Sequence, residues 1–225
     1  MVKQVFWVLV LAGVAGLFSG AAFSSDCHAA EANTIRVKIE TNKGDIVVAL
    51  DSEKAPITVA NFMQYVADGF YEGTIFHRVV SNFVIQGGGF DEEMNLKPTR
   101  DPIQNEAGNG LSNEAYTIAM ARTQAPDSAT SQFYINLKDN LFLDRTPQNP
   151  GYAVFGKVVA GREVADAIGR VDTVQEVPVE TVLIKKISQI NGDAPDDDDN
   201  PDDSDASNDN DDSSTCFIET CIAGH

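Results

Sequence analysis

Residues 76–90 read FHRVVSNFVIQGGGF and contain the clearest structural signal in the chain. Two runs rich in β-branched and aromatic residues, TIFHRVV at 74–80 and FVIQGG at 83–88, overlap this stretch and are separated by Ser-Asn. Short runs of this kind, bounded by turn residues, predict β-strands. The three glycines lack the Lys-Ser/Thr of a phosphate loop and the strand-to-helix context of a dinucleotide site, so we interpret them as a turn.

Outward from this stretch, most of the chain also predicts strands. Residues 34–50 indicate a hairpin, because apolar Ile35, Val37 and Ile39 alternate with polar residues before NKGD turns the chain into IVVAL. Further β-like runs, separated by Gly, Pro and Asn-rich segments, occupy residues 116–121, 131–137, 152–159 and 182–190.

Two helices are predicted among these strands. From Pro56, apolar residues recur at i, i+3, i+4 and i+7, namely at Val59, Phe62, Met63 and Val66. Gly69 then ends the helix, and GREVADAIGRV at 161–171 predicts a second, shorter one. A mostly β chain with two helices predicts a closed β-barrel, because closure removes exposed strand edges.

The amino end has the three-part layout of a secretory signal. Residues 1–30 contain an early Lys, an apolar stretch over 5–18 and a small-residue region with cleavage frames after Ser24, Ala29 or Ala32. The alternative is an uncleaved anchor, although the stretch is shorter than the roughly 20 strongly apolar residues of a membrane span. We therefore expect an exported protein whose folded domain covers residues 33–192.

The carboxyl end, residues 193–225, is an acidic tail. It has twelve acidic residues and no Lys or Arg, so it repels itself and is expected to be disordered. Residues 33–192 contain 20 acidic and 15 basic residues, a formal charge of −5. This charge argues against nucleic-acid binding. The tail is interpreted as solvating, with binding of Ca²⁺ or of cationic surfaces as the alternative.

Cysteine placement limits the chemistry of the domain. Cys27, Cys216 and Cys221 all lie outside residues 33–192, so the domain has no thiol nucleophile, disulfide or cysteine metal site. Cys216 and Cys221 are compatible with a small-loop disulfide, an intermolecular link or a sorting signal. His77 is the only histidine of the domain, and we interpret it as structural rather than as a catalytic base.

Four motifs together resemble the cyclophilin family of peptidyl-prolyl cis/trans isomerases, specifically its bacterial exported branch. They are residues 76–90, MARTQAPDSATSQFYINL at 120–137, FLD at 142–144 and GYAVFGKVVAG at 151–161. The similarity runs from Thr34 to Ile190 without a missing block. It implies a closed eight-stranded antiparallel β-barrel capped by two helices, with a proline-binding groove outside the barrel. It implies neither a cofactor nor a metal.

The reaction of this family explains which residues are needed. Rotation about an X-Pro amide faces a resonance barrier of about 18–20 kcal/mol, and no bond is made or broken. An enzyme needs only to bind the twisted amide better than the planar one. The resemblance implies that Arg78 contacts the proline carbonyl and approaches the prolyl nitrogen, as suits a permanently charged planar fork of donors. It implies that Gln86 and Gln132 hold Arg78 and the peptide backbone.

The resemblance also implies the walls of the groove. The proline ring is expected against Phe83, Val84, Tyr134 and Leu143, with Phe133 nearby in the same strand. Ala121 and Arg122 form the edge that pairs with the extended substrate, where Arg122 contributes its main chain.

Two departures from the drug-sensitive eukaryotic members are relevant to inhibitor binding. Phe142 stands where those members have Trp, and Tyr152 where they have His. Because Phe142 lacks an indole N–H donor, we expect weak cyclosporin binding.

The resulting hypothesis is a monomeric periplasmic isomerase that accelerates X-Pro rotation in exported proteins and so assists their folding. The competing hypothesis is a binding module that holds proline-containing segments in the same groove without turnover. The combination of Arg78, Gln86 and Phe83 favours the enzyme.

Overall fold

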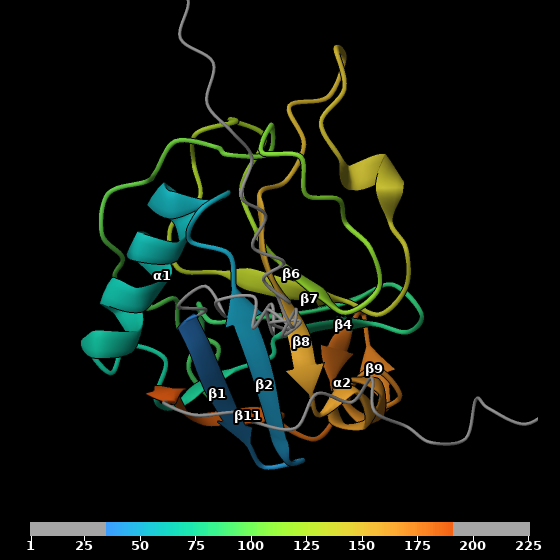
Figure 1. Ribbon diagram of the computed structural model, residues 1–225. Coiled ribbons are helices and arrows are strands. Elements are labelled where there is room, and N and C mark those ends of the chain that lie inside the picture. The colour runs from blue at the N-terminus through green and yellow to red at the C-terminus, as the bar shows by residue number, and fades with distance from the viewer. Residues whose placement is uncertain (1–34, 191–225) are drawn as a thin grey trace, which may run out of the picture. The chain divides into compact units, whose positions relative to one another are not determined.

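The computed structural model describes residues 35–190, so the expected signal segment, acidic tail and three cysteines lie outside the described residues. Figure 1 shows the arrangement of the described elements. In chain order they are β1 (Ile35–Thr41), β2 (Asp45–Leu50), α1 (Pro56–Ala67), β3 (Thr74–Ile75), β4 (Arg78–Val80), β5 (Val84–Gly87), β6 (Thr117–Met120), β7 (Phe133–Asn136), the 3-10 helix η1 (Leu141–Leu143), β8 (Val154–Ala160), α2 (Arg162–Ile168), β9 (Thr173–Val174), β10 (Val177–Pro178) and β11 (Leu183–Ile190).

The predicted hairpin over residues 34–50 is confirmed as β1 and β2, which pair in antiparallel register from Ile35 opposite Leu50 to Glu40 opposite Asp45. Val37 and Ile39 are fully buried while their neighbours are less so, which is the alternation expected of a strand with one covered face. On its other edge β1 pairs with β11, the last described strand. The two ends of the described chain are therefore joined in one ladder.

The mostly β prediction is confirmed, but the closed barrel of eight strands is not what the described residues form. They form a curled nine-stranded sheet in the order β3-β11-β1-β2-β8-β6-β7-β5-β4, in which β3 and β4 are not paired with each other. The physical reason lies in the segment 74–80, which changes partners after two residues. Its first part pairs with β11 and its second part with β5. One predicted strand thus becomes the two opposite edges of the sheet.

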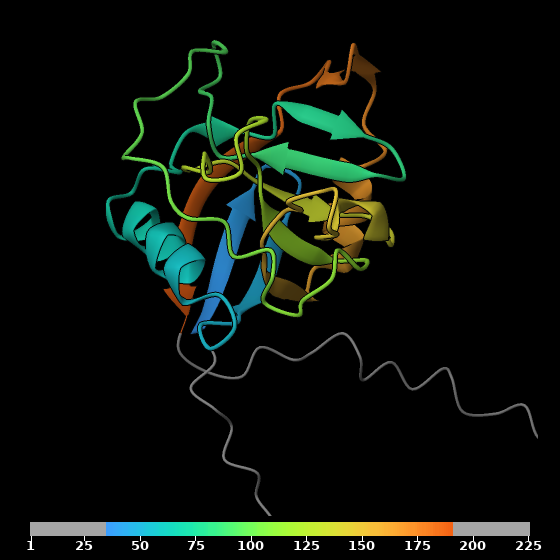
Figure 2. The ribbon, with the colours of Figure 1, turned by 90° about the horizontal axis from the view of Figure 1, so that it is seen from above.

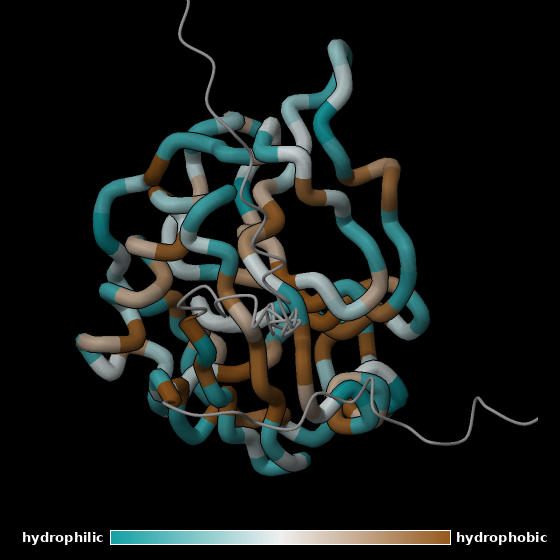
Figure 3. The backbone as a smooth tube through the Cα atoms, in the orientation of Figure 1, coloured by the Kyte–Doolittle hydropathy of each residue, from teal (hydrophilic) through white to brown (hydrophobic). Residues whose placement is uncertain are grey.

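The main core fills the interior of this sheet and is rich in aromatic rings. Phe62 of α1 lies within 5.2–5.7 Å, between ring centroids, of Tyr71, Phe133 and Phe155. Figure 3 shows the hydrophobic residues concentrated along β2 and β8, whereas the long connecting loops are mostly hydrophilic. Burial of these side chains is the main source of stability.

Both predicted helices are confirmed and contribute to this core. α1 buries Val59 and Phe62 of the predicted stripe, and α2 buries Ala165 and Ile168. The start of α1 has no capping side chain of its own. The carboxylate of Glu106 accepts hydrogen bonds from the backbone N–H groups of Ile57 and Thr58 instead, at 3.1 and 2.8 Å. A distant loop therefore satisfies the free donors of the first helical turn.

Two small elements were not predicted from the sequence. The hairpin β9–β10 has only two residues in each strand and contacts β4, beside which it lies in Figure 2. The 3-10 helix η1 exposes Leu141 and Phe142. Both elements border the site described next. None of the helices in residues 35–190 is long and apolar enough to cross a membrane.

Candidate active site

A row of directly paired residues crosses five strands of the sheet. Arg78 is opposite Gln86, Gln86 is opposite Tyr134, Tyr134 is opposite Ala119, and Ala119 is opposite Val154. Side chains at paired positions project from the same face of a sheet. The row therefore presents a cation and an amide at one end and apolar groups towards the other.

The apolar part of this row belongs to a second hydrophobic cluster, separate from the main core. Its buried members are Val84, Ala119, Tyr134 and Val154. Ile85 and Ile135, which follow Val84 and Tyr134 in their strands, belong to the main core instead. Because successive strand residues face opposite sides, the second cluster lies on the outer face of the sheet. Partly buried residues border it, namely Phe83, Leu111, Ala121, Leu143 and Tyr152.

The structure thus brings most of the predicted groove residues together, but it does not bring Phe133 to them. Phe133 is fully buried in the main core, with its ring centroid 6.0 Å from that of Phe76. Its neighbour Tyr134 faces the outer cluster. Adjacent residues of a strand point to opposite faces of the sheet, so Phe133 and Tyr134 of β7 cannot both face the groove. Their adjacency in the sequence was the signal that could have excluded Phe133 from the groove.

The hydroxyl of Tyr134 points into a buried amide network. It donates to the Asn113 side-chain oxygen at 2.7 Å, and Asn113 in turn donates its side-chain N–H to Asp144 at 2.8 Å. Burial is the largest cause that raises the pKa of Tyr134 well above its ordinary value, so the group remains a neutral donor. Asn113 has no sequence signal for this role, because it lies in a loop outside every recognised motif.

Arg78 lies at the rim of the outer hydrophobic cluster, where Glu176 of the β9–β10 hairpin turn holds its side chain. Its Nε donates to the Glu176 carboxylate at 2.7 Å, and its guanidinium carbon is 6.0 Å from the centroid of the Phe83 ring. Across the ladder, Gln86 Nε2 donates to Gln132 Oε1 at 3.0 Å. Glu176 was not predicted as a site residue, since it is 98 positions away from Arg78 in an unpredicted hairpin.

His77, next to Arg78, is buried and lies against the ring of Phe90 with a centroid separation of 4.6 Å. Desolvation by burial, followed by the charge of Arg78, lowers its pKa to about 4. The imidazole is therefore neutral at physiological pH.

Phe142 and Leu143 come from η1 at the other rim. The Phe142 ring is stacked on Phe83, with an interplanar angle of 14° and a centroid distance of 5.8 Å, and it is 65% exposed. The backbone N–H of Tyr152 donates to the Leu143 carbonyl at 3.0 Å, which fixes η1 against the cluster. An exposed ring stacked on a partly buried ring at the mouth of an apolar cluster is suited to contact a ligand.

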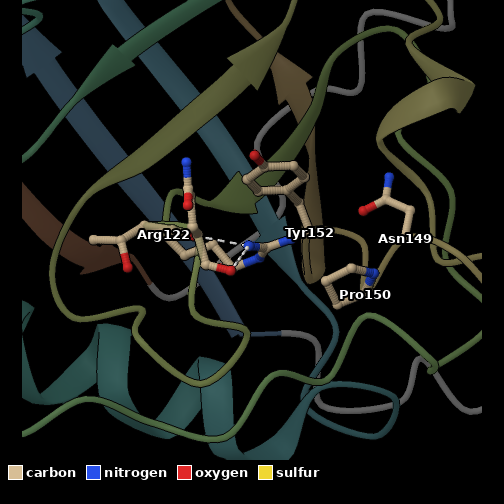
Figure 4. Close-up of a pocket in the computed structure, with 6 residues that line it drawn as sticks. Arg122, Asn149, Pro150 and Tyr152 are labelled. Atoms are coloured by element: carbon tan, nitrogen blue, oxygen red, sulfur yellow. Dashed lines mark hydrogen bonds between the residues drawn. The ribbon is translucent and has the colours of Figure 1, made fainter.

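Ala121 and Arg122 leave the sheet at the end of β6. The N–H of Ala121 donates to the Gln132 carbonyl, whereas within residues 35–190 the N–H of Arg122 meets no backbone carbonyl. The Arg122 side chain lies on the ring of Tyr152, 4.3 Å from its centroid (Figure 4). The backbone N–H of Arg122 is therefore available just beyond the end of β6, while the Arg122 side chain lines a separate hollow.

Comparisons with known proteins agree with this fold and show the family. The family described as cyclophilin type peptidyl-prolyl cis-trans isomerase/CLD matches residues 36–189. Peptidyl-prolyl cis-trans isomerase A of Dickeya dadantii is 52% identical over 178 residues, which cover 79% of this chain and 93% of that protein. Peptidyl-prolyl cis-trans isomerase B of Escherichia coli is 51% identical over 160 residues, which cover 68% of this chain and 98% of that protein.

A solved structure provides an independent match of the fold. The crystal structure of a Cryptosporidium parvum cyclophilin type isomerase is 26% identical, with a TM-score of 0.61, over 71% of this chain and 99% of that one. A second crystal structure of that protein was determined in the presence of the dipeptide Ala-Pro. The chain belongs to the cyclophilin-type peptidyl-prolyl cis-trans isomerase family. It is a peptidyl-prolyl cis-trans isomerase.

Proposed function

We propose that this enzyme accelerates rotation of X-Pro bonds in exported polypeptides by an arginine-assisted, non-covalent mechanism. The observation that carries the proposal is the paired row from Arg78 through Gln86 to Tyr134, which sets a fixed cation beside an apolar cluster on the outer face of the sheet. Proline offers an apolar ring and an adjacent carbonyl, the two features that such a surface can bind.

The apolar cluster holds the proline ring. Phe83, Tyr134 and Leu143 supply flat or branched hydrophobic walls, and Val84 lies at the base beside Tyr134. Because the Tyr134 hydroxyl is engaged by Asn113, the side facing the ring is apolar. The stacked Phe83 and Phe142 rings close the exposed edge of the pocket. Transfer of the ring from water into this site contributes binding energy that orients the amide.

Arg78 acts on the amide itself. In the proposed complex its Nη atoms donate to the proline carbonyl and approach the prolyl nitrogen, while Nε remains with Glu176. Twisting the X-Pro amide ends its conjugation and localises a lone pair on the nitrogen, so a nearby donor stabilises the twisted state more than the planar one. Gln86 and Gln132, linked at 3.0 Å, support the guanidinium and the peptide backbone from the neighbouring strands.

The backbone at Arg122, just beyond the end of β6, pairs with the extended substrate. An extended backbone segment with an unpaired N–H can pair with a peptide, which provides main-chain hydrogen bonds that are independent of sequence. Together with the proline pocket, this main-chain pairing allows one site to bind proline-containing segments of different sequence.

The test is isomerisation of an X-Pro tetrapeptide, measured by NMR exchange, for the native chain and Arg78→Ala. We expect kcat/KM to fall by about 10²–10³, the scale observed when a preorganised charge-stabilising donor is removed. Arg170→Ala is the matched control, because the Arg170 side chain is 72% exposed and, among residues 35–190, its ion pair is with Asp166 of α2, away from the site. Unchanged turnover in a folded Arg78→Ala variant would falsify the arginine-assisted mechanism.

We also propose that the enzyme acts in the bacterial periplasm and assists the folding of exported proteins, on the basis of the signal-like residues 1–30. Mass spectrometry of the protein recovered from a periplasmic fraction tests this proposal. Processing after Ser24, Ala29 or Ala32 supports it, and an intact Met1 in the cytoplasmic fraction contradicts it.

A further inference from the structure

A hollow with both polar and apolar walls adjoins the proline cluster and contains one charged side chain. It has a volume of about 480 Å³ and is lined by Arg122, Thr123, Gln124, Asn149, Pro150 and Tyr152. Figure 4 shows the Arg122 guanidinium lying under the Tyr152 ring, with Pro150 and Asn149 across the hollow. Every other lining side chain is uncharged, so the hollow has a local positive charge.

The guanidinium of Arg122 is fixed by neutral groups only. Its Nε donates to the Gly151 carbonyl at 3.0 Å and its Nη1 to the Thr123 carbonyl at 2.8 Å, while Tyr152 stacks on its face. In the described part of the chain no carboxylate forms an ion pair with Arg122. Of its five N–H donors, those on Nη2 remain for a ligand.

The carbonyl that holds Arg122 is itself rigidly placed. Gly151 has φ +71, and a Cβ at this position would lie 2.5 Å from the Arg145 backbone nitrogen, so no other residue fits. The Asn105 side chain donates to the same carbonyl at 3.1 Å, and Asn149 accepts the Gly151 N–H at 3.0 Å. The direction of Arg122 is thus fixed before any ligand arrives.

The hollow lies on the opposite side of Tyr134 from Arg78. Tyr152 meets Tyr134 edge to face at a centroid distance of 6.0 Å, while Arg78 is reached from Tyr134 in the other direction, through Gln86. In the proposed function Arg78 holds the proline carbonyl, which lies on the carboxyl side of the ring. A substrate so placed extends its preceding residue towards Arg122 and the hollow.

We propose that this hollow is a carboxylate-recognising subsite for an acidic residue directly before the proline, with Arg122 as its specificity-determining group. The inference rests on the proposed function. A planar guanidinium with free donors binds a carboxylate through charge-assisted hydrogen bonds, and stacking on Tyr152 keeps the fork in plane. The domain as a whole has a charge of −5, so general electrostatics oppose an acidic peptide and any preference for one must arise locally.

The experiment compares two acetylated, amidated peptides, Ala-Glu-Pro-Phe and Ala-Gln-Pro-Phe, which differ only in charge before the proline. For the native chain at low salt we expect kcat/KM to be about fivefold higher for the Glu peptide, and the ratio to fall in 0.5 M salt. Arg122→Gln is expected to bring the ratio of the two kcat/KM values to about one. Arg122→Lys retains part of the preference because it keeps the charge but loses the fork.

Equal turnover of the two peptides by the native chain, or an undiminished Glu preference in Arg122→Gln, overturns the proposal. A second pair, Ala-Ala-Pro-Glu and Ala-Ala-Pro-Gln, tests position, and an Arg122-dependent preference in that pair alone overturns the assignment to the preceding residue. A failure of the proposed catalytic role of Arg78 can be distinguished from a failure of the subsite proposal. In the first case Arg78→Ala keeps its turnover, while the ratio of kcat/KM for the Glu and Gln peptides still depends on Arg122.

Discussion

Arg78 Nε lies 2.7 Å from the Glu176 carboxylate, and this contact joins a strand edge to a hairpin turn. Glu176 and Gln175 form the two-residue turn between β9 and β10, with φ angles of 67° and 52°. A two-residue type I′ hairpin requires positive φ at both positions. The N–H of Val79 donates to the Glu176 carbonyl at 2.7 Å, so the turn is anchored beside the arginine that it contacts. The turn therefore positions Arg78 above Phe83.

Replacement of Glu176 by Gln is expected to lower kcat/KM by about two- to fivefold. The Arg78–Glu176 pair is partly exposed, at 36% and 50%, and such pairs contribute about 0.2–1 kcal/mol. Because exposed pairs are screened by salt, the difference between native and variant shrinks as ionic strength rises. NMR exchange on a neutral X-Pro peptide at two salt concentrations measures both effects.

The control for this prediction is Glu180→Gln, which removes a more exposed carboxylate paired with Lys43 in the same region of the chain. Its turnover should equal that of the native chain. If Glu176→Gln increased turnover instead, Glu176 would withdraw Arg78 from the substrate rather than position it.

Replacement of Tyr134 by Phe should affect stability rather than catalysis. The lost hydrogen bond to Asn113 costs about 1 kcal/mol, since the Asn113 oxygen keeps its contact with Asn136 at 3.2 Å. Turnover is expected to stay within about twofold, because the hydroxyl points away from the groove. Urea unfolding measures the loss of stability, and the isomerisation assay measures the change in turnover. A large loss of turnover at unchanged stability would place the hydroxyl on the substrate.

The stability of the domain should fall on mild acidification because of His77. The unfolded chain binds a proton at this residue below about pH 6.5, whereas the pKa of buried His77 is about 4. The free energy of unfolding therefore decreases as pH falls from about 6.5 to about 4, by about 2 kcal/mol at pH 5. Urea unfolding at pH 7.5 and pH 5 measures the loss. A His77→Gln variant with the same pH dependence as the native chain would exclude His77 as its source.

Replacement of Phe142 by Trp is expected to tighten cyclosporin binding at least tenfold from a weak starting value. The larger ring adds apolar contact on an exposed position beside Phe83, and the indole restores a donor. Calorimetric titration provides the dissociation constants. Leu141→Trp, on the neighbouring exposed residue of the same 3-10 helix, should bring no gain. Tight binding by the native chain would rule out this role of Phe142.

The sequence predicted the elements whose signal is local. The helix α1 follows from the spacing of Val59, Phe62 and Val66, and the β1–β2 hairpin from alternation around NKGD. Both patterns record which face of an element is buried, and burial of that face is what the tertiary structure requires. The edges of the sheet could not be predicted in the same way. The segment 74–80 has the composition of one strand, and only its distant partners divide it into two.

The residues of the candidate site that lie inside the sequence motifs could be predicted. Arg78, Gln86 and Tyr134 come from two motifs and meet in one row because β5 and β7 are paired. The supporting residues come from outside the motifs. The turn that contains Glu176 has Gln-Glu where Asn-Gly would signal a hairpin, and its conformation is held by contact with β4. Such a residue is determined by tertiary contact, which no local pattern records.

The ladder between β1 and β11 determines when this enzyme can reach its own folded state. Residues 35–41 of β1 need residues 183–190 as their partners on one side, and β3 needs the same last strand. A ribosome-bound chain that ends before Leu183 therefore lacks one whole side of the sheet, and contacts of such sequence separation form late because they close the longest loop. An enzyme that removes a slow step from the folding of other polypeptides thus completes its own folding only after the last strand has been synthesised.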